Sequence, residues 1–238
     1  MLRDSGPSWG TPYSQRRKLG RCVKTRKGRC PVTTKCRLCV AIVFGFLALT
    51  ALAAERYAFQ VEKNHSTVAF TIPIAGGLTK VTGKFTDFTA DIVWDSEDAA
   101  KSSVTATIQA ASMNTGIEAR DKDLRGPVFF DAATFPQLTY VSRKIEKRGD
   151  RFVVEGDLTM KGVTKPVVLT VVITGVDRGE KGDQAPILGI SATGKLNRLD
   201  FGIANDWKHT VIPNFLGNEI AIQIDLWTRG GKRVQKPS

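Results

Sequence analysis

Apolar side chains recur at every second position through most of residues 57–226. A period of two places successive side chains on opposite faces of a β-strand, so one face can be buried and the other solvated. The alternating runs cover residues 57–61, 68–74, 85–94, 104–108, 138–145, 152–160, 163–174, 187–196 and 220–226. This pattern predicts eight or more antiparallel strands, many of them joined to their neighbours in sequence.

Strands of this kind are expected to form a meander that closes into a barrel, because closure leaves no exposed sheet edge. A two-sheet sandwich uses the same alternation and stays open as an alternative. Turn residues predict hairpin connections at Lys147–Asp150 and Met160–Val163.

Two long segments interrupt the alternation, Asn114–Pro136 and Asn205–Gly217. Long loops in a barrel often carry function or cover an opening. The first segment has apolar residues at helical offsets, so we expect a short helix there, capped by Asn114 or Thr115.

Residues 38–54 carry no charged side chain and end in Ala51-Leu52-Ala53-Ala54. A basic segment, an apolar run and small residues in this order are typical of an export signal. We therefore expect a leader over residues 1–54 and a domain over residues 55–238, periplasmic or secreted. A retained membrane anchor and a start codon placed too far upstream are the alternatives. Arg16-Arg17 leaves the twin-arginine route open.

Most of the positive charge belongs to this leader. The chain carries +12, and residues 1–37 hold eleven Lys and Arg against one Asp, so only +2 remains for the rest. This balance gives no reason to expect a nucleic-acid partner. All four cysteines lie between Cys22 and Cys39, so the following domain has no thiol and is expected to fold without disulfides.

Side chains suited to catalysis are scarce. The only histidines are His65 and His209, both expected as turn or loop residues, and no G-x-S-x-G motif accompanies them. The absence of cysteine after Cys39 excludes Cys/His catalysis and most zinc sites, and the acidic residues lack calcium-loop spacing. We predict no metal site and no catalytic residue. An eight-stranded barrel can be filled by side chains or can hold one ligand, so a packed core and an apolar pocket both stay open.

Several motifs along the chain occur in a characteristic order. They are the opening from Tyr57 through Asn64-His65-Ser66 to Phe70, Val81-Thr-Gly83-Lys-Phe85-Thr-Asp-Phe88, Asn114-Thr115 through Arg120-Asp121 and Leu124-Arg125 to Phe129-Phe130-Asp131, Thr134-Phe135-Pro136, Gly156–Val167, Arg198-Leu-Asp200-Phe201-Gly202 and Gly217–Ile222. This ordered set resembles the YceI-like family of exported lipid-binding barrels over about Tyr57–Trp227.

The resemblance implies an extended, lipocalin-like antiparallel β-barrel of about eight strands, with a short helix in a long loop and an apolar tunnel. Its ligand would be a non-covalently bound isoprenoid or fatty-acyl-type lipid, with no covalent cofactor. The residues expected to contact the lipid are Phe59, Val68, Phe70, Ile72, Phe85, Phe88, Phe129, Phe130, Tyr140 and Phe201.

Four charged residues also match the motifs, namely Arg120, Asp121, Arg198 and Asp200. We expect them to fix loops through Arg–carboxylate ion pairs or to lie at the mouth of the pocket. The function predicted is that of a lipid carrier or sequestering protein. An enzyme or accessory acting on an isoprenoid or quinone lipid, or supporting a membrane redox partner, is the alternative. A transient contact with a membrane or membrane protein and a homodimer are left open.

The leader prediction can be tested directly. Because the uncharged run ends in small residues and is followed by Glu55 rather than basic residues, we expect cleavage near Ala53–Glu55. N-terminal sequencing of the exported protein checks this, and an exported chain that still begins at residue 1 contradicts it.

Overall fold

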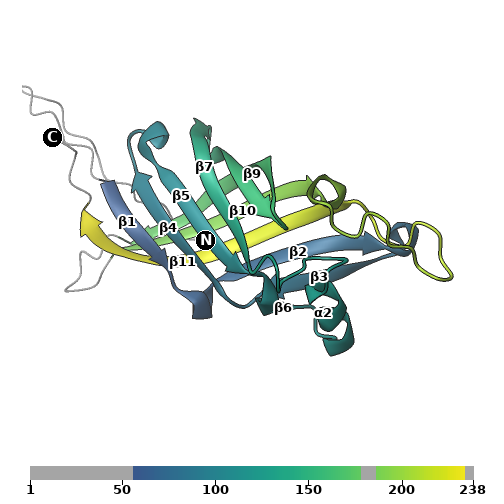
Figure 1. The fold of residues 1–238 in the computed structure, drawn as a ribbon. Helices are drawn as coiled ribbons and strands as arrows, with labels where there is room; N and C mark the ends of the chain where they lie inside the picture. The colour runs from purple at the N-terminus through teal and green to yellow at the C-terminus, as the bar shows by residue number, and fades with distance from the viewer. Residues whose placement is uncertain (1–55, 178–185, 234–238) are drawn as a thin grey trace, which may run out of the picture. The chain divides into compact units, whose positions relative to one another are not determined.

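Eight antiparallel strands close into a barrel in the computed structural model, which describes residues 56–177 and 186–233 (Figure 1). Around the ring, the strands are β1 (Arg56–Val61), β4 (Phe88–Asp95), β5 (Ser103–Gln109), β7 (Gln137–Arg148), β8 (Arg151–Met160), β9 (Val163–Asp177), β10 (Ile187–Asn197) and β11 (Glu219–Arg233). β11 pairs with β1 and completes the ring. The predicted barrel is confirmed, and the sandwich alternative is wrong.

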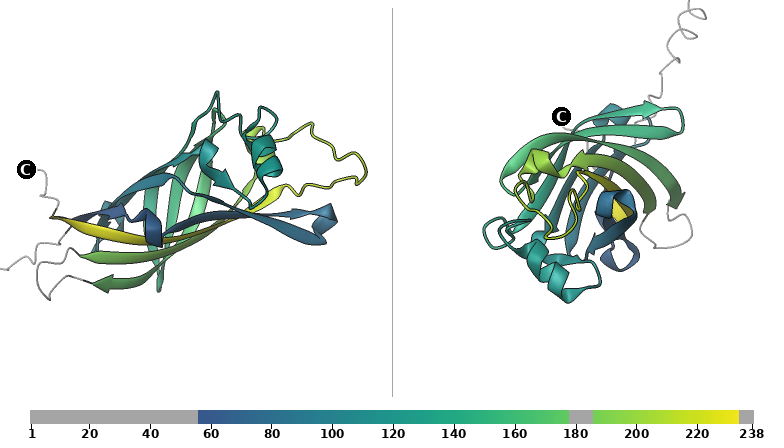
Figure 2. Two further views of the ribbon diagram at one scale, coloured as in Figure 1. Left: turned by 90° about the horizontal axis from the view of Figure 1, so that it is seen from below. Right: turned by 90° about the vertical axis from the view of Figure 1, so that its right-hand side faces the viewer.

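Three further strands extend the sheet beside the barrel. They are β2 (Thr67–Ile74), β3 (Thr79–Phe85) and β6 (Met113–Asn114). β11 pairs with β1 through Thr228–Arg233 and with β2 through Ala221–Asp225, so it changes partner along its length. The views in Figure 2 show β2 and β3 running on past the ring.

Local sequence explains the hairpins that join the barrel strands. β8 alternates buried and less buried residues along its whole length, which fixes its inward face. At the β8–β9 turn Lys161 and Gly162 both adopt positive φ (51° and 74°), as a tight two-residue turn requires. Met160 pairs with Val163, and Arg148 pairs with Arg151 across the β7–β8 turn. Both predicted hairpins are confirmed.

The helix expected in the first long loop is α2 (Glu118–Arg125). Its predicted cap is wrong. The N-cap residue is Ile117, which makes no side-chain capping bond. The Asn114 side chain instead accepts a hydrogen bond from Gly116 N (2.9 Å), and Thr115 bonds to Asp121 inside the helix. The polar side chains that suggested a cap therefore shape the turn before the helix.

Short 3-10 helices occupy several connections: η1 (Lys63–His65), η2 (Ala75–Gly77), η3 (Ala99–Lys101), η4 (Ala110–Ser112) and η5 (Arg198–Phe201). No helix in the described part of the chain has the length and hydrophobicity needed to cross a bilayer. The predicted leader, residues 1–54, lies outside the described residues and stays a prediction.

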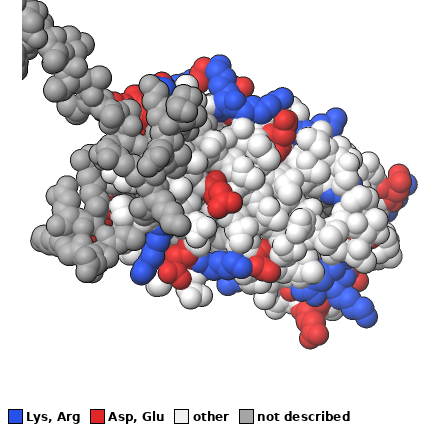
Figure 3. Space-filling model, turned by 60° about the vertical axis from the view of Figure 1, so that its left-hand side comes forward, with Lys and Arg blue, Asp and Glu red and all other residues white. Residues whose placement is uncertain are grey.

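Charged side chains on the barrel surface are of mixed sign. On the face drawn in Figure 3, Lys and Arg are interspersed with Asp and Glu and do not gather into one patch. Several are neighbours in ion pairs, such as Lys144 with Glu146 and Lys195 with Glu219. This face therefore presents no large patch of a single sign.

Candidate functional site

The barrel encloses a cavity of about 190 Å³. Seven barrel strands, together with β2 and β3, supply its lining, and no charged side chain belongs to it. A volume of this size has room for on the order of a dozen water molecules, whereas packed cores rarely contain voids larger than one. Of the two possibilities left open by the sequence, the structure has a hollow apolar interior and not a filled core.

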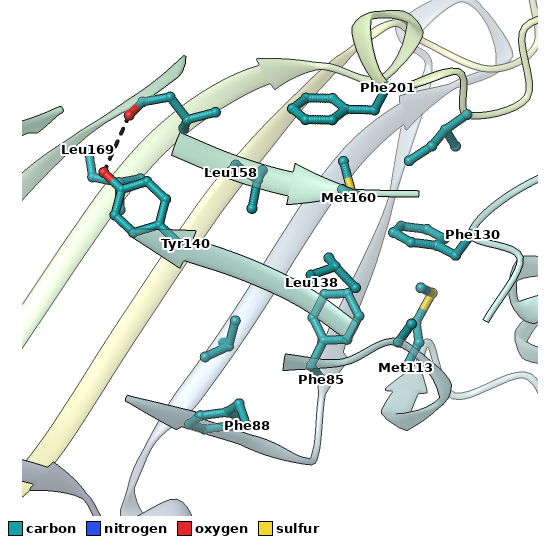
Figure 4. Packing of buried hydrophobic residues seen from close by; sticks show 14 of the residues in the cluster. Phe85, Phe88, Met113, Phe130, Leu138, Tyr140, Leu158, Met160, Leu169 and Phe201 are labelled. Carbon is teal, nitrogen blue, oxygen red and sulfur yellow. Dashed lines mark hydrogen bonds between the residues drawn. The ribbon is translucent and has the colours of Figure 1, made fainter. Parts of the chain in front are cut away.

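The cavity runs along the barrel. Phe152 and Met160 stand near opposite ends of β8 and both line it. Eight residues of extended strand span about 26 Å, so the cavity is long and narrow, like a tunnel. At one end the rings of Trp94 and Phe152 meet edge to face, with centroids 5.0 Å apart. At the other end Phe130 and Met160 lie beside Phe201 (Figure 4).

Tyr140 presents its ring to the cavity and turns its hydroxyl to the barrel wall. The hydroxyl lies 3.1 Å from Val154 O and 3.3 Å from Val167 O, and either carbonyl can accept its hydrogen bond. The ring packs on Gly156, where an added Cβ would come within 2.5 Å of it. Burial raises the pKa of Tyr140 to about 12, with a smaller contribution from the charge of Asp157. The cavity thus meets an aromatic ring and not a free phenol.

Six of the ten predicted lipid-contact residues line the cavity. They are Val68, Phe70, Phe85, Phe88, Phe130 and Tyr140. Phe70 and Phe85 pack against each other with ring centroids 5.8 Å apart, and Phe85 continues to Phe130 at 6.3 Å. These rings form a connected aromatic wall across β2, β3 and the loop after α2.

The other four lie outside the lining, each for a local reason. Ile72 pairs with Val81 of β3, in the part of β2 that has left β11. Phe59 packs directly over Gly230. A Cβ added to Gly230 would lie only 2.3 Å from the Phe59 ring. Phe129 faces Trp207, with ring centroids 6.0 Å apart, because its neighbour Phe130 takes the inward position.

Phe201 is the fourth. Its side chain is 1% exposed and packs in the core at the end of the cavity, beyond the lining. It closes this end with Met113 and Met160.

Sequence reasoning left out the opposite wall of the cavity. Trp94, Phe152, Leu188 and Ile190 line it, as do further aliphatic residues of β8–β11. The alternation along these strands marks them as inward-facing. However, a period of two does not say which strands surround a hollow, so the pattern alone could not assign them to a site.

Arg120 and Asp121 meet at one hydroxyl. Asp121 is 6% exposed, and its Oδ1 accepts from Thr115 N (2.9 Å) and Thr115 Oγ1 (2.6 Å). Arg120 Nε donates to the same Oγ1 (2.7 Å) and its Nη2 to Thr115 O (3.0 Å). Both residues fix the turn before α2.

Arg198 holds the second long loop. Arg198 is 6% exposed, and its guanidinium donates to the carbonyls of Gly217 (2.9 Å), Ile203 (2.7 Å) and Ala204 (2.9 Å), and to Asn218 Oδ1 (2.9 Å). Desolvation by burial lowers the pKa of this guanidinium. Asp200 is exposed on η5.

The ion pairs expected of these four residues are wrong: within the described residues none of the four takes part in a salt bridge. Their partners are mostly backbone groups, because irregular loops leave carbonyl and amide groups that need satisfying. None of the four lines the cavity.

The two long loops meet at the end of the barrel that Phe201 closes. Ala204 N donates to Val128 O (2.9 Å), and the Lys161 ammonium bridges Val128 O (3.2 Å) and Gly202 O (3.1 Å). Segments 114–136 and 198–217, the second of which begins earlier than the expected Asn205–Gly217, are thus joined at this end of the barrel, and we call them the loop cover.

A polar hollow adjoins the other end. Residues Asp95–Ala100 and Ile145–Arg148 surround it, and Ile145 and Phe152 line both it and the cavity. Asp95 is 1% exposed; its Oδ1 accepts from Glu97 N and Asp98 N, while its Oδ2 has no hydrogen-bond partner among the described residues. In residues 56–177 and 186–233 no group of three or more His, Cys, Asp or Glu is placed to hold a metal ion.

Comparison with known proteins gives a consistent result. The family model for the YceI-like domain matches residues 59–227. A UPF0312 protein of Photorhabdus laumondii is 34% identical over 159 residues, which cover 67% of this chain and 81% of that protein. A UPF0312 protein of Yersinia pestis is 36% identical over 161 residues, covering 68% and 82%.

Solved structures show the same fold. Burkholderia cenocepacia BcnA is similar with a TM-score of 0.61 and 27% identity, over 70% of this chain and 98% of that one. The Campylobacter jejuni YceI protein is similar with a TM-score of 0.57 and 31% identity, over 67% of this chain and 88% of that one. A polyisoprenoid-binding domain of Saccharophagus degradans, at 15% identity and 0.54, shares the fold over 73% and 98%.

Replacing Arg198 tests the loop anchor. Arg198→Met removes the guanidinium donors from four acceptors, two of which belong to the buried Ile203 and Ala204, so we expect a loss of about 3 kcal/mol in the free energy of unfolding. Arg198→Lys should recover little, because an ammonium cannot reproduce the planar fork. Urea denaturation measures both variants. Asp200→Asn is the control and should leave stability unchanged; equal effects of the substitutions at 198 and 200 contradict the anchor.

The raised pKa of Tyr140 leads us to expect a loss of stability at alkaline pH. Its pKa is raised in the fold, so its contribution is complete below pH 10 and is lost as the pH rises toward about 12. Two pKa units correspond to roughly 2–3 kcal/mol. Denaturation at pH 9 and at pH 11.5 measures the free energy of unfolding at each pH. The difference between the two values should be smaller for Tyr140→Phe than for the wild type. Equal pH dependence of the two proteins contradicts the prediction.

Proposed function

The chain belongs to the YceI-like family, and from this premise we propose that it is an exported protein that carries or sequesters a long isoprenoid or acyl lipid inside its barrel. The observation that carries the proposal is the apolar cavity with no charged lining residue. Such a ligand gains about 25 cal/mol for each Å² of apolar surface that leaves water and needs few polar contacts.

The cavity itself favours occupation. In core-substitution series, unfilled apolar volume costs about 24 cal/mol per Å³, so a cavity of about 190 Å³ costs the fold on the order of 5 kcal/mol while it is empty. A hydrocarbon chain restores the missing dispersion contacts. A domain of the same fold that is described as polyisoprenoid-binding illustrates that such barrels can accept a prenyl chain.

The charged groups support binding over catalysis. Arg120, Asp121 and Arg198 are committed to loop-fixing hydrogen bonds, and a catalytic centre needs ionisable groups that converge on the substrate. A charged headgroup also finds no partner in the lining, so the polar end of the ligand must stay outside it. Export to the periplasm or beyond forms part of the proposal through the uncharged run 38–54.

Filling the cavity tests the proposal without opening a void. Ala106 lines the cavity and its neighbour Thr105 is exposed on the outer face of β5. We expect Ala106→Phe to block the lipid and lower its retention at least tenfold, whereas Thr105→Phe should retain it. The measurement is mass spectrometry of lipid co-purified under gentle extraction, followed by titration with a long polyprenol and with oleic acid.

Circular dichroism provides the folding control, since both variants should keep a β-rich spectrum. Equal lipid retention by the two variants, or no bound lipid and no uptake of either probe by the wild type, contradicts the proposed function. Uptake of only one probe decides between the isoprenoid and acyl classes.

A further inference from the structure

Three large aliphatic side chains are exposed at the tips of two connections. Leu78, between η2 and β3, is 90% exposed. Val211 and Ile212, in the segment between η5 and β11, are 79% and 38% exposed. Isolated exposed aliphatic residues are common, but several at neighbouring loop tips need an explanation.

The two connections are bonded to each other. Ala75 N donates to Phe215 O (2.6 Å), Gly217 N donates to Pro73 O (2.9 Å), and Ile74 forms a β-bridge with Leu216. Figures 1 and 2 show the β2–β3 turn and the 205–217 segment projecting from the same end of the barrel. We call residues 75–80 and 208–213 together the docking tip.

The outward position of Val211 and Ile212 is built into the loop. His209 Nδ1 accepts hydrogen bonds from Val211 N (3.2 Å) and Ile212 N (3.0 Å), which closes the turn that carries them. The His209 ring stacks on Phe215 at 4.3 Å with 15° between the planes. His209 therefore fixes the turn that exposes Val211 and Ile212 to solvent.

We propose that the docking tip binds the surface of a lipid bilayer, with Leu78, Val211 and Ile212 entering the headgroup–acyl boundary. A protein partner needs a broad complementary face of about 800 Å² per side, which two narrow tips do not offer, whereas lipids adapt to any protrusion. Within the docking tip Lys80 and Lys208 are exposed and no residue is acidic; Asp206 lies just outside it. The two lysines attract anionic headgroups.

The proposal extends the proposed function by naming the surface from which the cavity is loaded. A row of rings leads inward from the tip. The ring centroids of Phe215 and Trp207 are 6.2 Å apart, and those of Trp207 and Phe129 are 6.0 Å apart. Phe129 is the neighbour of the cavity-lining Phe130. The docking tip therefore sits at the same end as the loop cover of the barrel.

Vesicle flotation tests the docking tip independently of the cavity. The protein is mixed with phosphatidylcholine vesicles and with vesicles that also contain phosphatidylglycerol. We expect the wild type to float with both, and more strongly with the anionic ones. The double variant Leu78→Asp/Val211→Asp should bind at least tenfold more weakly. The cavity-filling Ala106→Phe variant should bind like the wild type, so failure of lipid carriage and failure of docking give different results.

Two barrel-wall positions supply matched controls. Val141→Asp and Val168→Asp make the same change at residues that are 46% and 50% exposed, and they should leave vesicle binding unchanged. In a second measurement, Val211→Trp should shift its fluorescence to the blue on vesicles, whereas Val168→Trp should not. Lack of wild-type binding, or equal weakening by tip and wall variants, overturns the proposal. A dimer that dissociates on Val211→Asp also overturns it, because the tip would then be a protein interface.

Discussion

The change of partner along β11 is the constraint on which the rest of the structure depends. One continuous strand pairs with β10 from Glu219 to Arg229, with β1 over its C-terminal part and with β2 over its N-terminal part. The break is sealed by Ser66, whose Oγ donates to Glu62 O (2.7 Å) and accepts from Trp227 N (2.9 Å). The barrel therefore closes through β1, while β2 and β3 are released to continue beyond the ring.

Closure also explains why the interior is hollow. Eight strands make a ring whose centre side chains can only just fill. Here small residues at inward positions, such as Ala90, Ala106 and Ala192, leave the space that larger ones would occupy. Tyr140 bends its hydroxyl back to the wall because β8 has a glycine at position 156, beneath its ring. The hollow is apolar as a consequence of which residues the alternation points inward.

Much of this could be predicted from the sequence, and the failures have physical causes. Periodicity located the eight barrel strands and β2, and turn residues located both hairpins, because these signals depend only on local residue types. The alternating runs did not include β3 or β6. Periodicity misplaced Ile72 because β2 stops pairing with β11 after Thr71. It misplaced Phe59 because Gly230 on the partner strand makes room for the Phe59 side chain. The expected ion pairs of Arg198 and Arg120 became hydrogen bonds to backbone and hydroxyl oxygens, because the need of an irregular loop for donors cannot be seen in residue types alone.

The ends of the barrel differ in a way that assigns them different tasks. One end carries both long loops, closed over Phe201 and Met113 and tied together by Lys161. The other adjoins a hollow rich in charged side chains around Asp95. A lipid bound there, as proposed, would meet no charged lining group between the two ends, so the lining would select by shape and length and discriminate little between head groups. Under this proposal, specificity for a head group would come from polar residues at the two ends, because the lining offers only Thr89, Ser102 and Tyr140 as polar side chains.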